Sequence, residues 1–167
     1  VPSMFASFLE TVTTKDLTAR LECMKRIFLS GEALPLSVVR EFNEMRDIHS
    51  LPDLINLYGP TEATVDVSYY LCPKHDITNV YIGRPIDNTK LFVVNEKNVV
   101  QPVGVPGELL ITGVNLARGY INRPELTSEK FFSFKLPDGV ETRAYHTGDL
   151  VKLTPEGEIY YLGRMDN

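Results

Sequence analysis

The sequence predicts an α/β fold in which a strand-helix-strand portion with a parallel sheet precedes a mostly antiparallel bent sheet or distorted β-barrel lobe. Short apolar segments at 25–30 and 54–58 flank an amphipathic segment at 36–46, which is the order of a parallel unit with a helical crossover. Beyond residue 75, turn signals separate strand-like segments. We therefore expect a partial α/β subdomain over 1–75 and a β-rich, barrel-like subdomain over 76–167.

Apolar spacing defines the elements of the first portion. Residues 2–12 are predicted to form a helix, and 36–46 the crossover helix with Val38, Phe42 and Met45 on one face. Ligands of parallel sheets collect at the carboxyl ends of the strands, which here are Ser30-Gly31 and Tyr58-Gly59. The buried stripe of the first helix is expected to comprise Met4, Phe5, Phe8 and Leu9.

The elements of the second portion follow from its turns. A short helix is expected over 128–132, with Thr127 or Ser128 as its cap. The predicted strands are 90–94, 108–112, 144–147, 149–153 and 158–162.

Composition excludes several classes of protein. The 167 residues are 43% hydrophobic and 23% charged, as in ordinary globular proteins, and the net charge of −5 argues against nucleic-acid binding. No apolar stretch reaches the roughly 20 residues that span a bilayer, and the N-terminus lacks signal-peptide features. We expect a cytoplasmic protein without a membrane partner. Cys23 and Cys72 indicate neither a disulfide framework nor a zinc site.

The densest group of chemically useful residues lies at 56–62, Asn-Leu-Tyr-Gly-Pro-Thr-Glu. Gly59 allows the backbone to approach a ligand, and Tyr58 offers a flat face for a base. Thr61 offers a donor to phosphate, and Glu62 a hard oxygen ligand for Mg²⁺. The local alternative is a capped turn that starts a helix.

Two further groups lie in the second portion. Asp149 follows a break at Gly148, where a carboxylate can accept both hydroxyls of a ribose, whereas His146 is interpreted as structural. Arg164 can reach sugar or phosphate oxygens, and its alternative is an exposed ion pair with Asp166. The glycine-rich segment 107–113, which continues to 117–120, lacks the pattern of a phosphate loop and is interpreted as sheet bending and loop closure.

In this order the segments resemble the adenylate-forming superfamily, and most closely the amino-acid adenylation domains of nonribosomal peptide synthetases. The resemblance runs nearly end to end: residues 56–65 are similar to the fifth core motif of that family, 107–121 to the sixth, and 145–150 to the seventh. Residues 163–166 are similar to the start of the eighth. Four ordered motifs favour the nucleotide-site interpretation over the local alternatives.

The resemblance implies a role for each matching residue. Tyr58 stacks on adenine, whose edge is recognised by Asn56 and nearby backbone, and Asp149 binds the ribose. Thr61 touches the phosphate and Glu62 holds Mg²⁺. Tyr161 and Arg164 line the nucleotide from the far side, and Asp166 matches the hinge about which a small C-terminal lobe swings.

The implied reaction is attack of an amino-acid carboxylate on the α-phosphorus of ATP, which gives aminoacyl-AMP and pyrophosphate. The acyl group then passes to the phosphopantetheine thiol of a peptidyl carrier domain. Such catalysis needs positioning and Mg²⁺ rather than a nucleophilic triad. The implied partners are the amino acid, the carrier domain, the remainder of the adenylation domain and neighbouring synthetase domains.

The sequence departs from the family pattern in two ways. The family's phosphate loop, the residue that grips the substrate amine and the lobe with the catalytic lysine fall outside 1–167, so we expect part of an enzyme that is inactive alone. Asn115 replaces a glycine that is usual in the sixth motif, and Asn tolerates a positive φ.

The resemblance also implies a substrate pocket at the strand ends, with Ser30 and Asp66 as its polar members. Read in order, the pocket residues Phe-Ser-Leu-Val-Asp resemble the second half of the set of pocket residues by which the family selects serine. We therefore expect L-serine or a close relative as the substrate. The competing interpretation is a substrate whose cationic side chain pairs with Asp66. An acyl- or aryl-CoA ligase and a non-catalytic scaffold fragment are the rival functions. The pocket positions are Phe28, Ser30, Gly31, Leu57, Val65 and Asp66.

Overall fold

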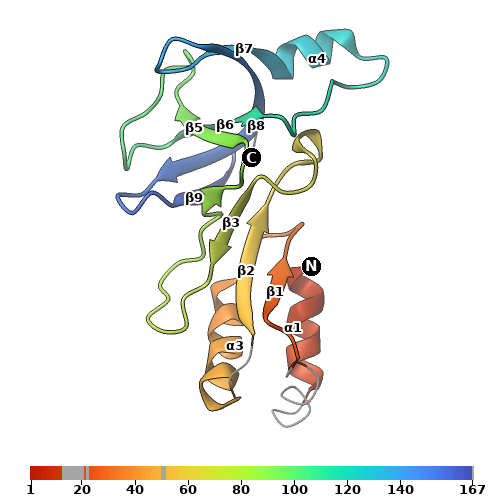
Figure 1. Ribbon diagram of the computed structural model, residues 1–167, viewed down its shortest axis with the longest axis vertical. Helices are drawn as coiled ribbons and strands as arrows, with labels where there is room; N and C mark the ends of the chain where they lie inside the picture. The colour runs from red at the N-terminus through yellow and green to blue at the C-terminus, as the bar shows by residue number, and fades with distance from the viewer. Residues whose placement is uncertain (13–20, 22, 50–51, 167) are drawn as a thin grey trace.

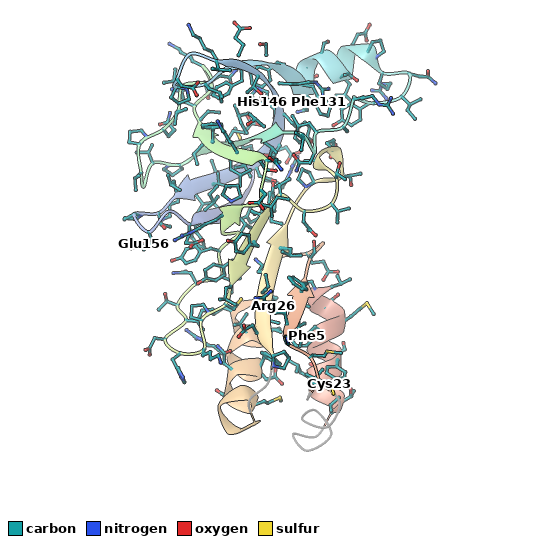
Figure 2. All side chains as sticks on the ribbon, in the orientation of Figure 1. Phe5, Cys23, Arg26, Phe131, His146 and Glu156 are labelled. Carbon is teal, nitrogen blue, oxygen red and sulfur yellow. The ribbon has the colours of Figure 1, made fainter. Side chains whose placement is uncertain are left out.

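The computed structural model describes residues 1–12, 21, 23–49 and 52–166, and these form two sheets, one at each end of an elongated molecule (Figure 1). The first sheet has the strand order β1-β2-β3-β4, and helices α1 and α3 pack against it. The second has the order β5-β6-β8-β7, with β9 paired to β8. Figure 2 labels Phe5 in the lower, helix-covered part and Phe131 and His146 in the upper, β-rich part.

The predicted parallel unit is confirmed. Strands β1 (Arg26–Leu29) and β2 (Asp53–Tyr58) run parallel, and α3 (Leu36–His49) connects them. Phe42 of α3 is fully buried against the sheet, which is the hydrophobic packing that holds a crossover helix in place. The ends of the two strands therefore meet at one edge of the sheet.

Helix α1 (Pro2–Thr11) confirms the first predicted helix and corrects its buried stripe. Phe5 and Leu9 are buried, and the Phe5 ring meets that of Phe42 edge to face at 5.4 Å. Met4 is 70% exposed, so its assignment to the stripe is wrong. It precedes Phe5 by one residue, which rotates it about 100° away from the sheet.

Two strands of the first sheet were not predicted. Strand β3 (Ser68–Leu71) pairs antiparallel with β2, and β4 (Arg84–Pro85) pairs with β3. Ser68 is a polar residue in an inward-facing position, where its hydroxyl donates to the Ile82 carbonyl at 2.6 Å. A serine in the core disguises the alternation that marks a strand. The boundary expected near residue 75 stays a prediction.

The second portion is an open, bent, mostly antiparallel sheet rather than a closed barrel in the described residues. Its strands are β5 (Thr89–Val94), β6 (Gly107–Gly113), β7 (Phe131–Lys135), β8 (Glu141–Leu153) and β9 (Ile159–Arg164).

Strand β8 corrects the prediction of two separate strands, because it runs unbroken through Gly148. Gly148 has φ +72°, a conformation that glycine adopts at low cost, so the strand bends there without ending. The part of β8 before the bend pairs with β7, and the part after it pairs with β9.

The short helix of the second portion begins earlier than predicted. Helix α4 spans Pro124–Lys130 with Pro at its start, because proline presets the helical φ and needs no N–H donor there. Thr127 is therefore not its cap. Phe131 and Phe132 belong to β7 instead of the helix. In the described part of the chain, no helix has the length and apolar character needed to cross a bilayer.

Candidate functional site

A cavity of about 540 Å³ lies between the carboxyl end of β2 and the strands β8 and β9 of the other sheet. Its volume falls in the range of small-molecule sites. Of the residues expected from sequence, it is lined by Gly31, Asn56, Leu57, Tyr58, Gly59, Asp149 and Tyr161.

Tyr58 and Asp149 meet at this cavity. The Tyr58 hydroxyl donates a hydrogen bond to Oδ2 of Asp149, whose residue is 7% exposed. Burial, followed by the negative charge of Asp149, raises the pKa of Tyr58, so the phenol keeps its proton and remains a donor. The end of β2 and the second sheet therefore both contribute to the wall of the cavity.

Arg164 approaches the same carboxylate from β9. Its Nη1 donates to Oδ1 of Asp149 at 3.1 Å and to the Thr147 carbonyl at 2.7 Å. The alternative ion pair is also formed, because Nε lies 3.1 Å from Oδ1 of Asp166. Hydrogen bonding to Asp166, and secondarily to Asp149, raises the pKa of Arg164. The guanidinium thus links the site to the end of β9.

Glu108 contacts the bend at Gly148, which directly precedes Asp149 in the chain. Oε1 of Glu108 accepts from the Gly148 N–H at 2.8 Å, and Oε2 lies 2.8 Å from Nδ1 of His146. Partial burial raises the pKa of Glu108, but these bonds outweigh it and leave the pKa below its ordinary value. The His146 ring is stacked on Phe132 at 4.4 Å, which supports the structural interpretation of this histidine.

Asn56 lies in the wall of the cavity with one polar atom unused. Its Nδ2 donates to the Tyr81 carbonyl at 2.8 Å, whereas its buried Oδ1 has no hydrogen-bond partner in the described structure. A buried acceptor without a partner costs free energy that a ligand donor can recover.

Thr61 and Glu62 begin the turn that follows Gly59 and do not line the cavity. Thr61 is exposed, whereas an oxygen of Glu62, Oε1, accepts from the Tyr120 hydroxyl at 2.6 Å. Partial burial raises the pKa of Glu62, but the hydrogen bond from Tyr120 and further bonds outweigh it and lower the pKa. Glu62 is therefore an ionised carboxylate at neutral pH.

The turn closes tightly on itself, and Gly59 permits this. A Cβ at Gly59 would overlap the Val65 carbonyl oxygen. Val65 itself has φ +75°, and the Asp66 N–H donates to the Thr64 carbonyl at 3.1 Å, so the chain makes a three-residue turn at a strained β-branched residue. Such strain persists where surrounding contacts hold it.

The expected substrate positions fall into two groups. Ser30 Oγ donates to Oδ1 of Asp66 at 2.6 Å, which joins the two polar members. Gly31 and Leu57 lie at the cavity, whereas Phe28 and Val65 are 56% and 68% exposed.

Sequence reasoning missed several residues of the site. Tyr160 and residues 78–80 line the cavity, Glu108 accepts from the Gly148 N–H next to Asp149, and Tyr120 donates to Glu62. No local signal marks residues 78–80. The sequence showed that Glu108 and Tyr120 belong to the glycine-rich segment and its continuation. It did not show their hydrogen-bond partners, which lie 40 and 58 residues away in the chain.

Asn115 was expected to replace a glycine because asparagine tolerates a positive φ. This explanation is wrong, because the φ of Asn115 is not positive. The Nδ2 of Asn115 donates instead to the Ala63 carbonyl at 3.2 Å.

The described residues contain no group of three or more side chains that could hold a metal ion by themselves. Mg²⁺ is commonly bound through one or two carboxylates together with substrate phosphates. A single ionised carboxylate at Glu62 fits that kind of site, and the unpaired Oδ1 of Asn56 fits a ligand with a hydrogen-bond donor.

Comparisons with known proteins identify the family of the chain. The family described as AMP-binding enzyme matches residues 1–121. The chain is 46% identical over 168 residues to Zwittermicin A synthase ZmaJ of Bacillus cereus, covering 99% of this chain and 31% of that protein. It is 44% identical over 165 residues to Tyrocidine synthase 3 of Brevibacillus parabrevis, covering 98% of this chain and 2% of that protein.

Solved structures share the fold. An artificially fused adenylation-PCP di-domain of a nonribosomal peptide synthetase, NpsA-ThdA from Klebsiella oxytoca, superposes with a TM-score of 0.84 at 23% identity, over 98% of this chain and 29% of that one. The N-terminal subdomain of Klebsiella oxytoca NpsA in complex with 3-hydroxybenzoyl-AMSN gives a TM-score of 0.80 at 25% identity, over 98% of this chain and 40% of that one.

The chain belongs to the family of AMP-binding enzymes, and the solved structures that share its fold include an adenylation domain of a nonribosomal peptide synthetase. It spans less than a third of the length of the two curated relatives.

Proposed function

We propose that the chain supplies part of the nucleotide site and part of the substrate pocket of an ATP-dependent adenylation domain that activates an amino acid. The observation that carries the proposal is the cavity in which Tyr58, Asp149 and Tyr161 come together from both sheets. We infer that it holds the adenosine of ATP.

The chemistry of the cavity wall suits adenosine. One oxygen of the Asp149 carboxylate accepts a hydrogen bond from Tyr58, and the other accepts one from Arg164. Each oxygen has a second lone pair, so both ribose hydroxyls can find an acceptor on this carboxylate. Asn56 Oδ1 suits the exocyclic amine of adenine. The rings of Tyr58 and Tyr161, with centroids 6.5 Å apart and planes 38° apart, offer flat apolar surface to the base.

We assign phosphate contact to Thr61 and the Mg²⁺ ligand to Glu62. The metal, when bound, neutralises phosphate charge and favours attack at the α-phosphorus. The amino-acid carboxylate forms a bond to that phosphorus, the bond to the leaving pyrophosphate breaks, and aminoacyl-AMP results. The chain's own contribution is to orient the nucleotide and to exclude water from the cavity.

We infer L-serine, or a close relative, as the amino acid. The hydrogen bond between Ser30 and Asp66 supports a pocket with hydroxyl-binding groups, because each partner keeps lone pairs for a substrate hydroxyl. The competing substrate is an amino acid with a cationic side chain, which would pair with Asp66 directly.

Further parts of the cycle belong to the whole protein. The aminoacyl group would pass to a phosphopantetheine thiol on a peptidyl carrier domain, with the rest of the adenylation domain and neighbouring synthetase domains as partners. The adenylation-PCP arrangement of the NpsA-ThdA structure supports this. Asp166 is proposed as the hinge of the C-terminal lobe, and its hydrogen bond with Arg164 gives it a contact near the nucleotide cavity.

ATP-pyrophosphate exchange by the full-length protein, measured for each proteinogenic amino acid, ornithine and 3-hydroxybenzoate, tests the proposal. We expect serine to give the fastest exchange. Faster exchange with lysine or ornithine would defeat the serine assignment and retain the adenylation chemistry. Exchange with the aryl acid alone would favour an aryl ligase, and no exchange with any acid would favour a scaffold.

A further inference from the structure

The proposed Mg²⁺ ligand is held by a separate segment of the chain. Glu62 receives the Tyr120 hydroxyl at Oε1, at 2.6 Å, and its carbonyl receives the Ala117 N–H at 2.7 Å. Both the side chain and the main chain of Glu62 are therefore tied to the segment 115–120, which we call the brace.

The brace also holds the residues that follow Glu62. Asn115 Nδ2 donates to the Ala63 carbonyl at 3.2 Å, and the Asn115 carbonyl accepts from Thr64 Oγ1 at 2.6 Å. Four hydrogen bonds thus join two segments more than fifty residues apart in sequence. They leave the turn that carries the carboxylate little freedom to shift.

The brace is anchored independently of Glu62. Arg143 donates to the Ala117 carbonyl at 2.5 Å and to the Arg118 carbonyl at 2.8 Å, and the Tyr120 N–H donates to Thr127 Oγ1 at 2.9 Å. The Tyr120 ring also packs on Phe131, with centroids 5.8 Å apart. A support that is fixed by other contacts can hold a carboxylate in place.

A glutamate side chain has three rotatable bonds, and fixing it costs conformational entropy. The hydroxyl of Tyr120 restricts those bonds before any ligand arrives. It uses one oxygen of the carboxylate through a hydrogen bond, and both oxygens retain lone pairs that can face a cation.

We propose that Tyr120 is a positioning residue that acts through Glu62 and presets this carboxylate for a magnesium-nucleotide complex. The inference rests on the proposed function. It assigns a task to a tyrosine that the sequence had marked only as part of a loop-closing segment. Partners that orient metal ligands typically change metal affinity by about 10- to 100-fold when removed.

The test uses the full-length protein with Tyr120→Phe, which keeps the ring packed on Phe131 and removes only the hydroxyl. Tyr69→Phe is the matched control, because Tyr69 lies 45% exposed on β3, away from the cavity lining. Isothermal titration measures binding of ATP with excess Mg²⁺ and of ATP with EDTA, and thermal unfolding reports folding.

We expect Tyr120→Phe to weaken binding of magnesium ATP by about 10-fold and to leave binding of ATP in EDTA within twofold of the wild type. Tyr69→Phe should alter neither. Equal losses with and without Mg²⁺ would show a merely structural role, and unchanged binding of both forms would overturn the inference. A wild type that binds neither form would overturn the proposed function, and this inference with it.

A double-mutant cycle gives a second, independent readout. In a Glu62→Gln background, Tyr120→Phe should cause no further loss of magnesium-ATP affinity, because the two residues act as one unit. Additive losses would mean that Tyr120 does not act through Glu62. If Tyr120→Phe lowers the unfolding temperature, the cycle still shows whether Tyr120 acts through Glu62. The reason is that both single variants and the double variant are compared at a temperature where all of them are folded.

Discussion

The hydroxyl of Tyr58, at the end of a parallel strand, donates its hydrogen bond to the buried carboxylate of Asp149, which lies 91 residues further along the chain in the other sheet. The bond closes one wall of the cavity and brings together two groups that were assigned to a nucleotide from their motifs. Its energetic consequences can be measured.

Tyr58→Phe should destabilise the protein by about 1 kcal/mol, because the change removes one buried hydrogen bond and keeps the ring. It should also weaken ATP binding, since Asp149 is then oriented by Arg164 with one fewer partner. Urea unfolding and isothermal titration measure the two effects. Unchanged stability together with unchanged ATP affinity would show that the bond has no role in either.

Gly59→Ala should abolish nucleotide binding and cost about 2–3 kcal/mol of stability, because the new methyl group would overlap the Val65 carbonyl in a tightly closed turn. Gly139→Ala is the matched control. It lies in a hairpin turn with open space around it and φ +87°, so it should lose about 1–2 kcal/mol from backbone strain while ATP binding persists. A Gly59→Ala protein with normal ATP affinity would contradict the described turn.

Glu108→Gln should make the free energy of unfolding less dependent on pH. The pKa of Glu108 is lowered in the folded state, so its carboxylate stabilises the fold above its ordinary pKa, and this contribution is lost as the pH falls through the lowered value. We expect the free energy of unfolding of the wild type to exceed that of the variant by about 1–2 kcal/mol at pH 7. This difference should shrink below pH ~4. Urea unfolding followed by circular dichroism at both pH values measures it, and an equal difference at both would contradict the assignment.

Ser30→Ala should lower kcat/KM for serine relative to alanine by about 10-fold, because the pocket loses a hydroxyl that would otherwise bind the substrate hydroxyl or hold Asp66 for it. The KM for ATP should stay the same, since Ser30 does not line the nucleotide cavity. Pyrophosphate exchange with both amino acids measures the ratio. An unchanged ratio would remove Ser30 from the specificity groups.

The parallel unit could be predicted because its signals are local. Short apolar strands on either side of a helix with Phe42 on its buried face leave few other arrangements. Strand β3 was missed because Ser68 satisfies its hydroxyl inside the core, which a hydrophobic pattern does not register. The two predicted strands of β8 are one because Gly148 bends the chain and the pairing with neighbouring strands continues past it.

The motifs could identify Tyr58, Glu62 and Asp149 as candidate ligand groups, because residue type and order carry that information. The contacts of these groups could not be predicted in the same way. Glu108 and Tyr120 meet their partners only after strands from distant parts of the chain have paired.

The sequence by itself determined the class of protein, and it led us to expect a ligand at two strand ends and to name the residue types offered there. Only the tertiary structure decided that Tyr58 faces Asp149, that Ser30 reaches Asp66 and that Tyr120 supports Glu62. The physical reason is that periodicity and turn chemistry act over a few neighbouring residues, whereas these hydrogen bonds depend on strand register and on how two sheets are oriented toward each other.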